Sequence, residues 1–149
     1  MTQLDVVAEL AKKSGLLWIR HDDRTYPVWH EWIADEDGGG AVCVVGDGGE
    51  QPLPPVADGG VVTLLLRAKS DRHLVASVDA TVEQISPDDD RWPAITDTLK
   101  SGRLNLPDSD NAVERWARES RVLRMVPREP VALASEMATD RARTYPRLA

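Results

Sequence analysis

The sequence of 149 residues lacks several features that mark common classes of protein. Its single cysteine, Cys43, cannot form an internal disulfide, so nothing points to an oxidising compartment. No apolar stretch approaches the length that spans a membrane, and the N-terminus has no basic segment followed by an apolar run. We therefore expect a cytoplasmic protein that has no membrane partner.

Basic residues are scarcer than acidic ones, with 18 Lys and Arg against 25 Asp and Glu, which gives a formal charge of −7. This balance argues against a nucleic-acid partner, because neutralising phosphates requires clustered positive charge. The charge is uneven, however, since residues 112–128 contain five arginines and two glutamates. This basic segment suits a small anion or an acidic partner surface, and it equally suits a solvated face with Arg–Glu pairs.

Motifs of hydrolytic and metal-dependent enzymes are missing as well. There is no GxSxG nucleophile motif, and the histidines His21, His30 and His73 form no HxH or HExxH pattern. We therefore expect no metal ion and assign no catalytic residue. Cys43 has no base or positive charge beside it in the sequence, so we interpret it as a core residue rather than a nucleophile.

The glycine-rich corner GDGGEQ at 46–51 does not have the spacing of a nucleotide-binding loop. A phosphate loop requires GK[ST] at the start of a helix, whereas Pro52, Pro54 and Pro55 forbid a regular helix here. We expect a short, proline-broken helical turn after this corner. The glycines leave two alternatives, a close approach of the backbone to a ligand and an ordinary tight turn.

What the sequence does contain is an ordinary globular composition, 42% hydrophobic and 29% charged, with short strand patterns between turn signals. We expect one domain over 1–133 and a C-terminal tail over 134–149. The predicted helices cover 2–14, about 93–100 and 112–119, and the predicted strands cover 16–21, 26–33, 41–46, 61–69, 74–85 and 122–126. Most strands follow one another through hairpins, which favours a mainly β, antiparallel barrel over a parallel sheet.

Alternation assigns the faces of these strands. Strand 26–33 places Val28, His30 and Trp32 on one face, opposite Trp29, Glu31 and Ile33. Strand 41–46 is apolar throughout, which predicts burial of both faces. Strand 74–85 has one apolar face, formed by Ala76, Val78, Ala80 and Val82. The sheet is therefore expected to bury one face along strand 74–85 and both faces at 41–46.

The aromatic residues are skewed to five tryptophans and two tyrosines, with no phenylalanine. Trp18, Trp29 and Trp32 lie on adjacent predicted strands, where they either wall a flat ring or contribute to the core or a dimer contact. His30 lies between two of them in the sequence. It is either a hydrogen-bonded, half-buried histidine or a contact for a ligand.

The order of these elements carries a resemblance. Pro27-Val28-Trp29 on the second strand is followed by the corner and strand at 48–67, the long strand at 75–85, and RVLRMVP at 121–127. Over residues 4–131 this order and spacing resembles the FMN-binding split barrels, the superfamily of pyridoxamine 5′-phosphate oxidase and its flavin- and deazaflavin-binding relatives. The resemblance implies an antiparallel split β-barrel that forms a homodimer.

The resemblance also implies a cofactor, FMN or deazaflavin, bound at the subunit interface. In that superfamily the flavin ring lies along the second and third strands, which implicates Trp29, His30 and Val44 here. The phosphate is held at the corner, which implicates Gly49 and Gln51.

The corner departs from the superfamily in its charge, because Glu50 and Gln51 stand where Arg or Lys is usual. Arg67, Lys69 or an arginine from segment 115–124 of the second subunit would supply the missing positive charge. The resemblance therefore implies a flavin- or deazaflavin-binding, oxidoreductase-like protein. The alternative is a split-barrel binding or interaction protein that performs no catalysis and has lost its cofactor affinity.

Overall fold

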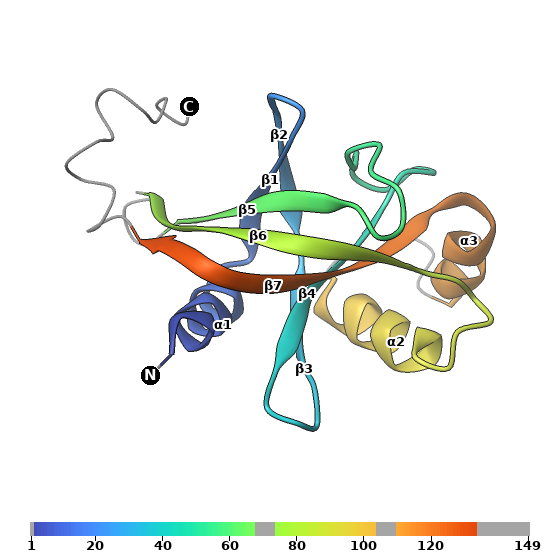
Figure 1. Cartoon of the computed structure of the whole chain (residues 1–149). Coiled ribbons are helices and arrows are strands. Elements are labelled where there is room, and N and C mark those ends of the chain that lie inside the picture. The colour runs from blue at the N-terminus through green and yellow to red at the C-terminus, as the bar shows by residue number, and fades with distance from the viewer. Residues whose placement is uncertain (1, 68–73, 104–109, 134–149) are drawn as a thin grey trace.

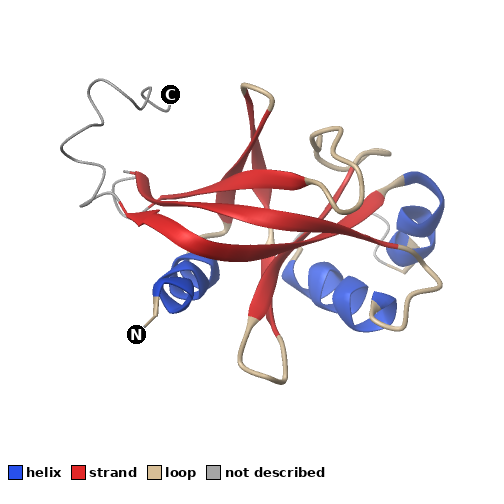
Figure 2. Cartoon of the chain, viewed as in Figure 1, coloured by secondary structure: helices blue, strands red, loops and turns tan. Residues whose placement is uncertain are grey.

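A computed structural model describes residues 2–67, 74–103 and 110–133 of the chain. The chain is mainly β, with one antiparallel sheet of seven strands and three short helices (Figures 1 and 2). The elements are α1 Gln3–Lys13, β1 Leu16–His21, β2 Arg24–Trp29, β3 Glu31–Ala34, β4 Gly40–Gly46, β5 Val61–Arg67, β6 Leu74–Ile85, α2 Trp92–Gly102, α3 Ala112–Glu119 and β7 Arg121–Leu133. None of the helices in these ranges is long and apolar enough to cross a membrane.

The sheet curls into a half-barrel because its two edge strands are neighbours in the chain. The strand order is β2-β1-β5-β6-β7-β4-β3, so β2 and β3 lie at opposite edges although only His30 separates them. The predicted antiparallel split barrel is therefore confirmed. The prediction of one continuous strand over 26–33 is wrong, because the chain must leave one edge of the sheet at His30 and join the other.

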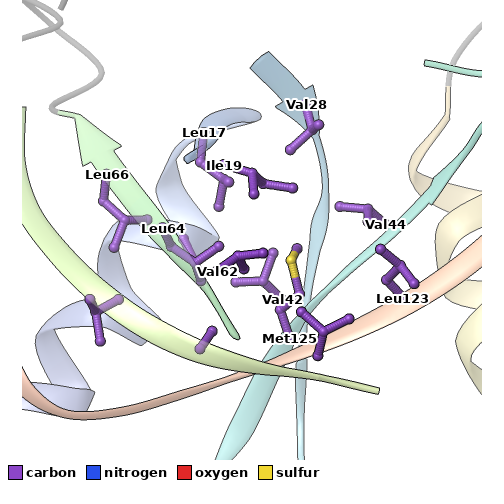
Figure 3. Packing of buried hydrophobic residues seen from close by; sticks show 14 of the residues in the cluster. Leu17, Ile19, Val28, Val42, Val44, Val62, Leu64, Leu66, Leu123 and Met125 are labelled. Carbon is purple, nitrogen blue, oxygen red and sulfur yellow. The ribbon is translucent and has the colours of Figure 1, made fainter. Parts of the chain in front are cut away.

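The interior of the half-barrel is an apolar core, which we call the inner core (Figure 3). Leu17, Ile19, Val42 and Leu64 from three strands are at most 1% exposed. The four residues that alternation assigned to the apolar face of β6 are all buried there as predicted: Ala76, Val78, Ala80 and Val82. The amphipathic helix α1 packs Val7 and Ala11 against the inner core. Removing this apolar surface from water is the main stabilising contribution to the fold.

A second apolar cluster, the outer core, lies on the other side of the sheet beneath α2 and α3 (Figure 1). Cys43 and Val45 of β4 belong to this outer core, whereas Val42 and Val44 belong to the inner core. The prediction that both faces of β4 are buried is therefore confirmed. Cys43 is fully buried, and burial raises the pKa of its thiol to about 12, which agrees with a core residue.

The end of the last strand and the segment after the glycine-rich corner differ from the sequence-based expectations, and both contain prolines. The last strand was expected to end at 126, but β7 continues past Pro127 to Leu133. Beyond Met125 it pairs with β6 alone among the described strands, so its other edge makes no ladder hydrogen bonds there and tolerates a residue without an N–H. Residues 52–57 form neither a helix nor a strand, so the expected helical turn is absent. Lys69 and the predicted tail lie outside the described residues.

Candidate functional site

The glycine-rich corner forms a tight turn between β4 and the extended segment that leads to β5. We call residues 46–53 the corner loop. The N–H of Asp47 donates to the carbonyl of Gln51 at 2.8 Å, and the N–H of Glu50 donates to the carbonyl of Asp47 at 3.0 Å. Asp47, Gly48 and Gly49 all have positive φ, at 64°, 56° and 91°. A side chain at Gly48 would run into the backbone carbonyl of Glu119, so this glycine lets the loop pack against the end of α3.

The Gln51 side chain forms hydrogen bonds that connect β2 to β4, and we call this connection the clasp. Its Oε1 accepts from the N–H of Trp29 at 2.8 Å, and its Nε2 donates to the carbonyls of Trp29 at 2.9 Å and Val45 at 3.1 Å. These bonds join the end of β2 to the end of β4, where the two strands do not pair with each other. The amide that was expected to face a phosphate therefore binds backbone groups with both of its N–H donors and with its oxygen.

Glu50 turns inward from the corner loop into a set of three donors, which we call the Glu50 cluster. Its Oε2 accepts from Arg115 Nη2 at 2.8 Å and from Trp116 Nε1 at 3.1 Å, and its Oε1 accepts from Arg103 Nη1. The Glu50 side chain is only 2% exposed. The cluster joins the corner loop to the C-terminal end of α2 and to α3, so it ties three elements to one buried carboxylate.

The electrostatic balance at Glu50 favours the charged carboxylate. Burial by itself raises the pKa of Glu50, but the hydrogen bonds from Arg115 and Trp116 and the positive charge of Arg103 outweigh it. The net result is a pKa below the ordinary value of 4.5. The carboxylate is thus a permanent anion inside the protein at neutral pH.

Asp47 forms a second ion pair in the same loop. Arg121 Nε donates to Asp47 Oδ2 at 2.6 Å, and Arg121 Nη2 donates to the carbonyls of Leu53 at 3.3 Å and Pro54 at 3.0 Å. Farther along β7, Arg124 pairs with Asp35 and Glu83. The five arginines of the basic segment divide accordingly. Arg115, Arg121 and Arg124 pair with carboxylates, and Arg118 and Arg128 are exposed. The segment therefore contains arginine–carboxylate pairs, and the three paired arginines are only 13–22% exposed.

Trp29 links the corner loop to the strand where a flat ring was expected. The guanidinium of Arg103 lies over its indole, with Cζ at 5.1 Å from the ring centroid, so Arg103 contacts both Trp29 and Glu50. Trp29 also packs against the outer core, whereas Trp32 packs against the inner core. The two tryptophans therefore face opposite sides of the sheet, as alternation predicted, and do not form one wall.

His30 occupies the point where β2 gives way to β3. It is 3% exposed, and its Nε2 donates to the carbonyl of Ala11 at 2.8 Å. Burial lowers its pKa below the ordinary 6.5, although its contacts with backbone carbonyls act in the opposite direction. His30 also lines a cleft of about 240 Å³ between α1 and β3, together with Glu31 and Trp32. His30 is therefore a buried histidine that is hydrogen-bonded to the backbone, which is one of the two alternatives for it. The cleft beside it has space for a small ligand.

Two other residues of the expected site lie apart from the corner loop. The Val44 side chain is fully buried in the inner core, so only its backbone remains for a ligand. Arg67 is the last residue of β5, which pairs with β1 (Figure 1). Its guanidinium lies over Trp18 at 5.1 Å from the ring centroid. Within one subunit the structure therefore groups Trp29, Gly49 and Gln51, and it places Arg67 over Trp18 on the strand next to β2.

Three residues of the site were not found from the sequence, namely Arg103, Arg115 and Trp116 as partners of Glu50. Arg115 and Trp116 lie in the basic segment that the sequence singled out, but nothing local indicated that they face the corner loop. The available signal was Glu50 itself, an acidic residue where the resemblance led us to expect a cation. A buried carboxylate requires positive partners, and these come from segments more than 50 residues away in the chain.

The corner loop does not fit a phosphate group in the conformation described. Arg103 and Arg115 already bind the Glu50 carboxylate, and Arg121 already binds Asp47 and two backbone carbonyls. A phosphate placed among them would lie next to a buried negative charge. We therefore derive no contact between a phosphate and this loop. Within the described ranges, no three His, Cys, Asp or Glu side chains gather in a way that would hold a metal ion.

Comparison with known proteins gives structural matches only. No protein-family model and no curated protein matches the chain. The general stress FMN/FAD-binding protein of Xanthomonas citri has a TM-score of 0.58 and 14% identity, covering 87% of each chain. The FAD- and heme-binding protein of Mycobacterium smegmatis has a TM-score of 0.55 and 14% identity, covering 94% of this chain and 79% of its own.

A third match is the heme storage protein HutZ of Vibrio cholerae. It has a TM-score of 0.52 and 9% identity, and the alignment covers 89% of this chain and 95% of that protein. At such identities the matches establish a shared fold. The chain has the FMN-binding split-barrel fold, in which the structural neighbours bind flavin or heme.

Proposed function

We propose that the protein binds a flavin-type ring compound at the interface of a homodimer and acts as an oxidoreductase-like protein. The observation that carries the proposal is the split-barrel fold, shared with proteins whose names state that they bind FMN or FAD. Both FMN and a deazaflavin remain candidates for the ring compound. Flavins supply hydride transfer when they are bound, and the role of this chain is to position the ring and exclude water.

The ring would lie along the end of β2, beside Trp29. This side chain is half-buried and has Arg103 over its indole, so an aromatic surface and a fixed guanidinium stand together. Its cross-strand partner Leu16 is 48% exposed, which makes it one of the two most exposed large apolar residues in the described part of the chain. An apolar patch of this kind supports a contact with a second subunit on this side of the sheet.

A second candidate function is a split-barrel binding or interaction protein that has no cofactor. The Glu50 cluster favours it, because the charge that would hold a cofactor phosphate is already neutralised inside the protein. In that case the fold serves as a scaffold and its surface carries the function.

Ligand titrations followed by tryptophan fluorescence test the proposal. We expect riboflavin, FMN, FAD or a deazaflavin to quench the wild-type protein saturably, and size-exclusion chromatography with light scattering to report a dimer. A Trp29→Leu variant should lose the quenching. Trp32→Leu is the control, since Trp32 packs against the inner core, on the opposite side of the sheet from Trp29.

The outcomes separate the two candidates. Quenching that survives in Trp32→Leu and disappears in Trp29→Leu supports a ring site on β2. Saturable binding of heme but of no flavin would retain a ring-binding protein and overturn the flavin assignment. Absence of binding by every one of these ligands would support the second candidate.

A further inference from the structure

We propose that the Glu50 carboxylate is a built-in anion that occupies an oxyanion site at the corner loop, so that the protein recognises ring ligands without using a phosphate at this position. Glu50 would then determine ligand specificity, because its negative charge would exclude a ligand phosphate from the corner loop. The ligand part of this inference rests on the function proposed above. The anion-site part does not depend on it.

The donors around Glu50 have the arrangement of an anion site. Two guanidinium groups and one indole N–H converge on the two oxygens, and they come from the end of α2 and from α3. Charge-assisted hydrogen bonds from arginine are the usual means of holding a carboxylate or a phosphate. Because the donors belong to separate elements that are packed on the outer core, their positions do not depend on Glu50 alone.

The anion in this site belongs to the chain and is shielded from solvent. The Glu50 side chain is 2% exposed, whereas Arg103 is 28% and Arg115 is 20% exposed. An incoming phosphate would approach the arginines from their exposed side and meet the carboxylate behind them. Like charges at such short range repel one another strongly where water is excluded. The phosphate could bind well only if Glu50 left the site.

The loop backbone holds Glu50 in place. Its N–H donates to the carbonyl of Asp47, and the adjacent Gln51 is clasped to Trp29 and Val45. On the other side, Arg115 Nη1 donates to the carbonyl of Gly48 at 3.3 Å. Moving the carboxylate out of the site would therefore disturb the turn and the clasp together, which makes displacement by a ligand unfavourable.

The first test measures anion binding directly, with inorganic phosphate as the probe. Melting temperatures are recorded at increasing phosphate and constant ionic strength for wild type, Glu50→Ala and Glu50→Gln. Glu83→Ala is the matched control, because Glu83 also pairs with two arginines, Arg91 and Arg124, but lies on β6 and is 33% exposed. Glu50→Gln keeps the shape of the side chain and removes its charge, so it serves if the alanine variant does not fold.

We expect phosphate to raise the melting temperature of both Glu50 variants by at least about 2 °C, since a ligand that binds only the folded state stabilises it. Wild type and Glu83→Ala should show no such rise. An equal rise in the wild type would overturn the proposal, because the site would then be open despite Glu50. No rise in either Glu50 variant would overturn it as well, because the donors would not form an anion site.

The second test compares riboflavin with FMN, which differ by the phosphate. We expect wild type to bind the two within about threefold of each other, and Glu50→Ala to favour FMN by about tenfold or more. A wild-type preference for FMN of about tenfold or more would contradict the proposed specificity. If neither compound binds any variant, these two flavins are excluded as ligands and the phosphate test alone decides the anion site.

Discussion

Two tryptophan–arginine pairs lie beside each other on the hairpin of β1 and β2, where Trp18 pairs with Pro27 and Trp29 with Leu16, and they differ in what surrounds the arginine. Arg103 covers Trp29 and Arg67 covers Trp18, each at 5.1 Å from the ring centroid. Arg103 also binds the Glu50 carboxylate. Arg67 has two buried nitrogens, Nε and Nη2, without a hydrogen-bond partner among the described residues. The same two residue types thus form an ion-paired network at Trp29, whereas at Trp18 two nitrogens of the arginine have no hydrogen-bond partner among the described residues.

The comparison shows why the location of positive charge was hard to infer. The corner loop was expected to need a cation and in fact has an internal anion with its own cations. Arg67, expected to supply charge to the corner, is the last residue of β5 and lies over Trp18 instead. The interaction energy of a charged side chain depends on its distance from other charged groups. That distance does not follow from the position of the residue along the chain.

Removing the Glu50 carboxylate should give the largest loss of stability among these substitutions. Arg103 would then lie over a tryptophan without a carboxylate partner, as Arg67 does among the described residues. We expect Glu50→Ala to lower the free energy of unfolding by about 2–3 kcal/mol, somewhat less than for a fully buried pair because both arginines are partly exposed. Glu83→Ala, with its more exposed pairs, should cost less than about 1 kcal/mol. Urea unfolding of both variants measures the difference. Equal losses would mean that burial of Glu50 contributes nothing.

Removing the hydrogen bonds of the Gln51 side chain should give the second-largest loss of stability. Gln51→Ala leaves the N–H and carbonyl of Trp29 and the carbonyl of Val45 without their partner, which we expect to cost about 2 kcal/mol. Gln51→Glu is the control, since it retains an acceptor for the N–H but no donor for the carbonyls. Hydrogen exchange at Trp29 should therefore rise strongly in the alanine variant and less in the glutamate variant. Unchanged exchange in both would show that the clasp is not needed.

Folding stability should depend on pH through His30, which follows Trp29 in the chain. Its folded pKa lies below the ordinary 6.5, so the unfolded chain takes up the proton first as the pH falls. Stability from the neutral histidine is complete above about pH 6.5 and declines below it, by at most about 1.4 kcal/mol per pH unit. A His30→Gln variant, which keeps an N–H donor and does not titrate, should lack this component. Identical pH dependence of the two proteins between pH 7 and 5 would contradict the assignment.

The smallest change in stability should come from substituting Arg67. Arg67→Met removes a cation–π contact and also two buried nitrogens that have no hydrogen-bond partner among the described residues, so the free energy of unfolding should change by no more than about 0.5 kcal/mol. Arg103→Met removes the same kind of contact together with an ion pair, and it should destabilise by about 1–2 kcal/mol. Equal effects of the two substitutions would remove the distinction between the two tryptophan–arginine pairs.

Much of the fold follows from periodicity and turn chemistry. The alternation of β6 identified its inner face, and the uniformly apolar β4 indicated burial on both sides. Helix α1 begins at the predicted cap Thr2, and α3 matches its predicted range. These features are local, because a strand or helix must present its apolar residues at the spacing of its own backbone. Even across the break at His30, the predicted faces of Trp29 and Trp32 are correct.

The site was predicted less completely. Gly49, Gln51 and Trp29 were singled out and do lie near one another, but Gln51 binds backbone groups of Trp29 and Val45 rather than pointing to an open site. The break at His30 was missed because no proline or glycine marks it. It arises only because β2 and β3 belong to opposite edges of one curled sheet.

The sequence by itself determined the strands, their buried faces and the tight corner, since each depends on spacing and residue type within a few positions. Only the tertiary structure decided that Glu50 meets Arg103, Arg115 and Trp116, and that Arg67 stands apart from them. The physical reason is that electrostatic and hydrogen-bonding energies depend on distances between segments, and those distances exist only once the sheet has curled and the helices have packed on its outer face.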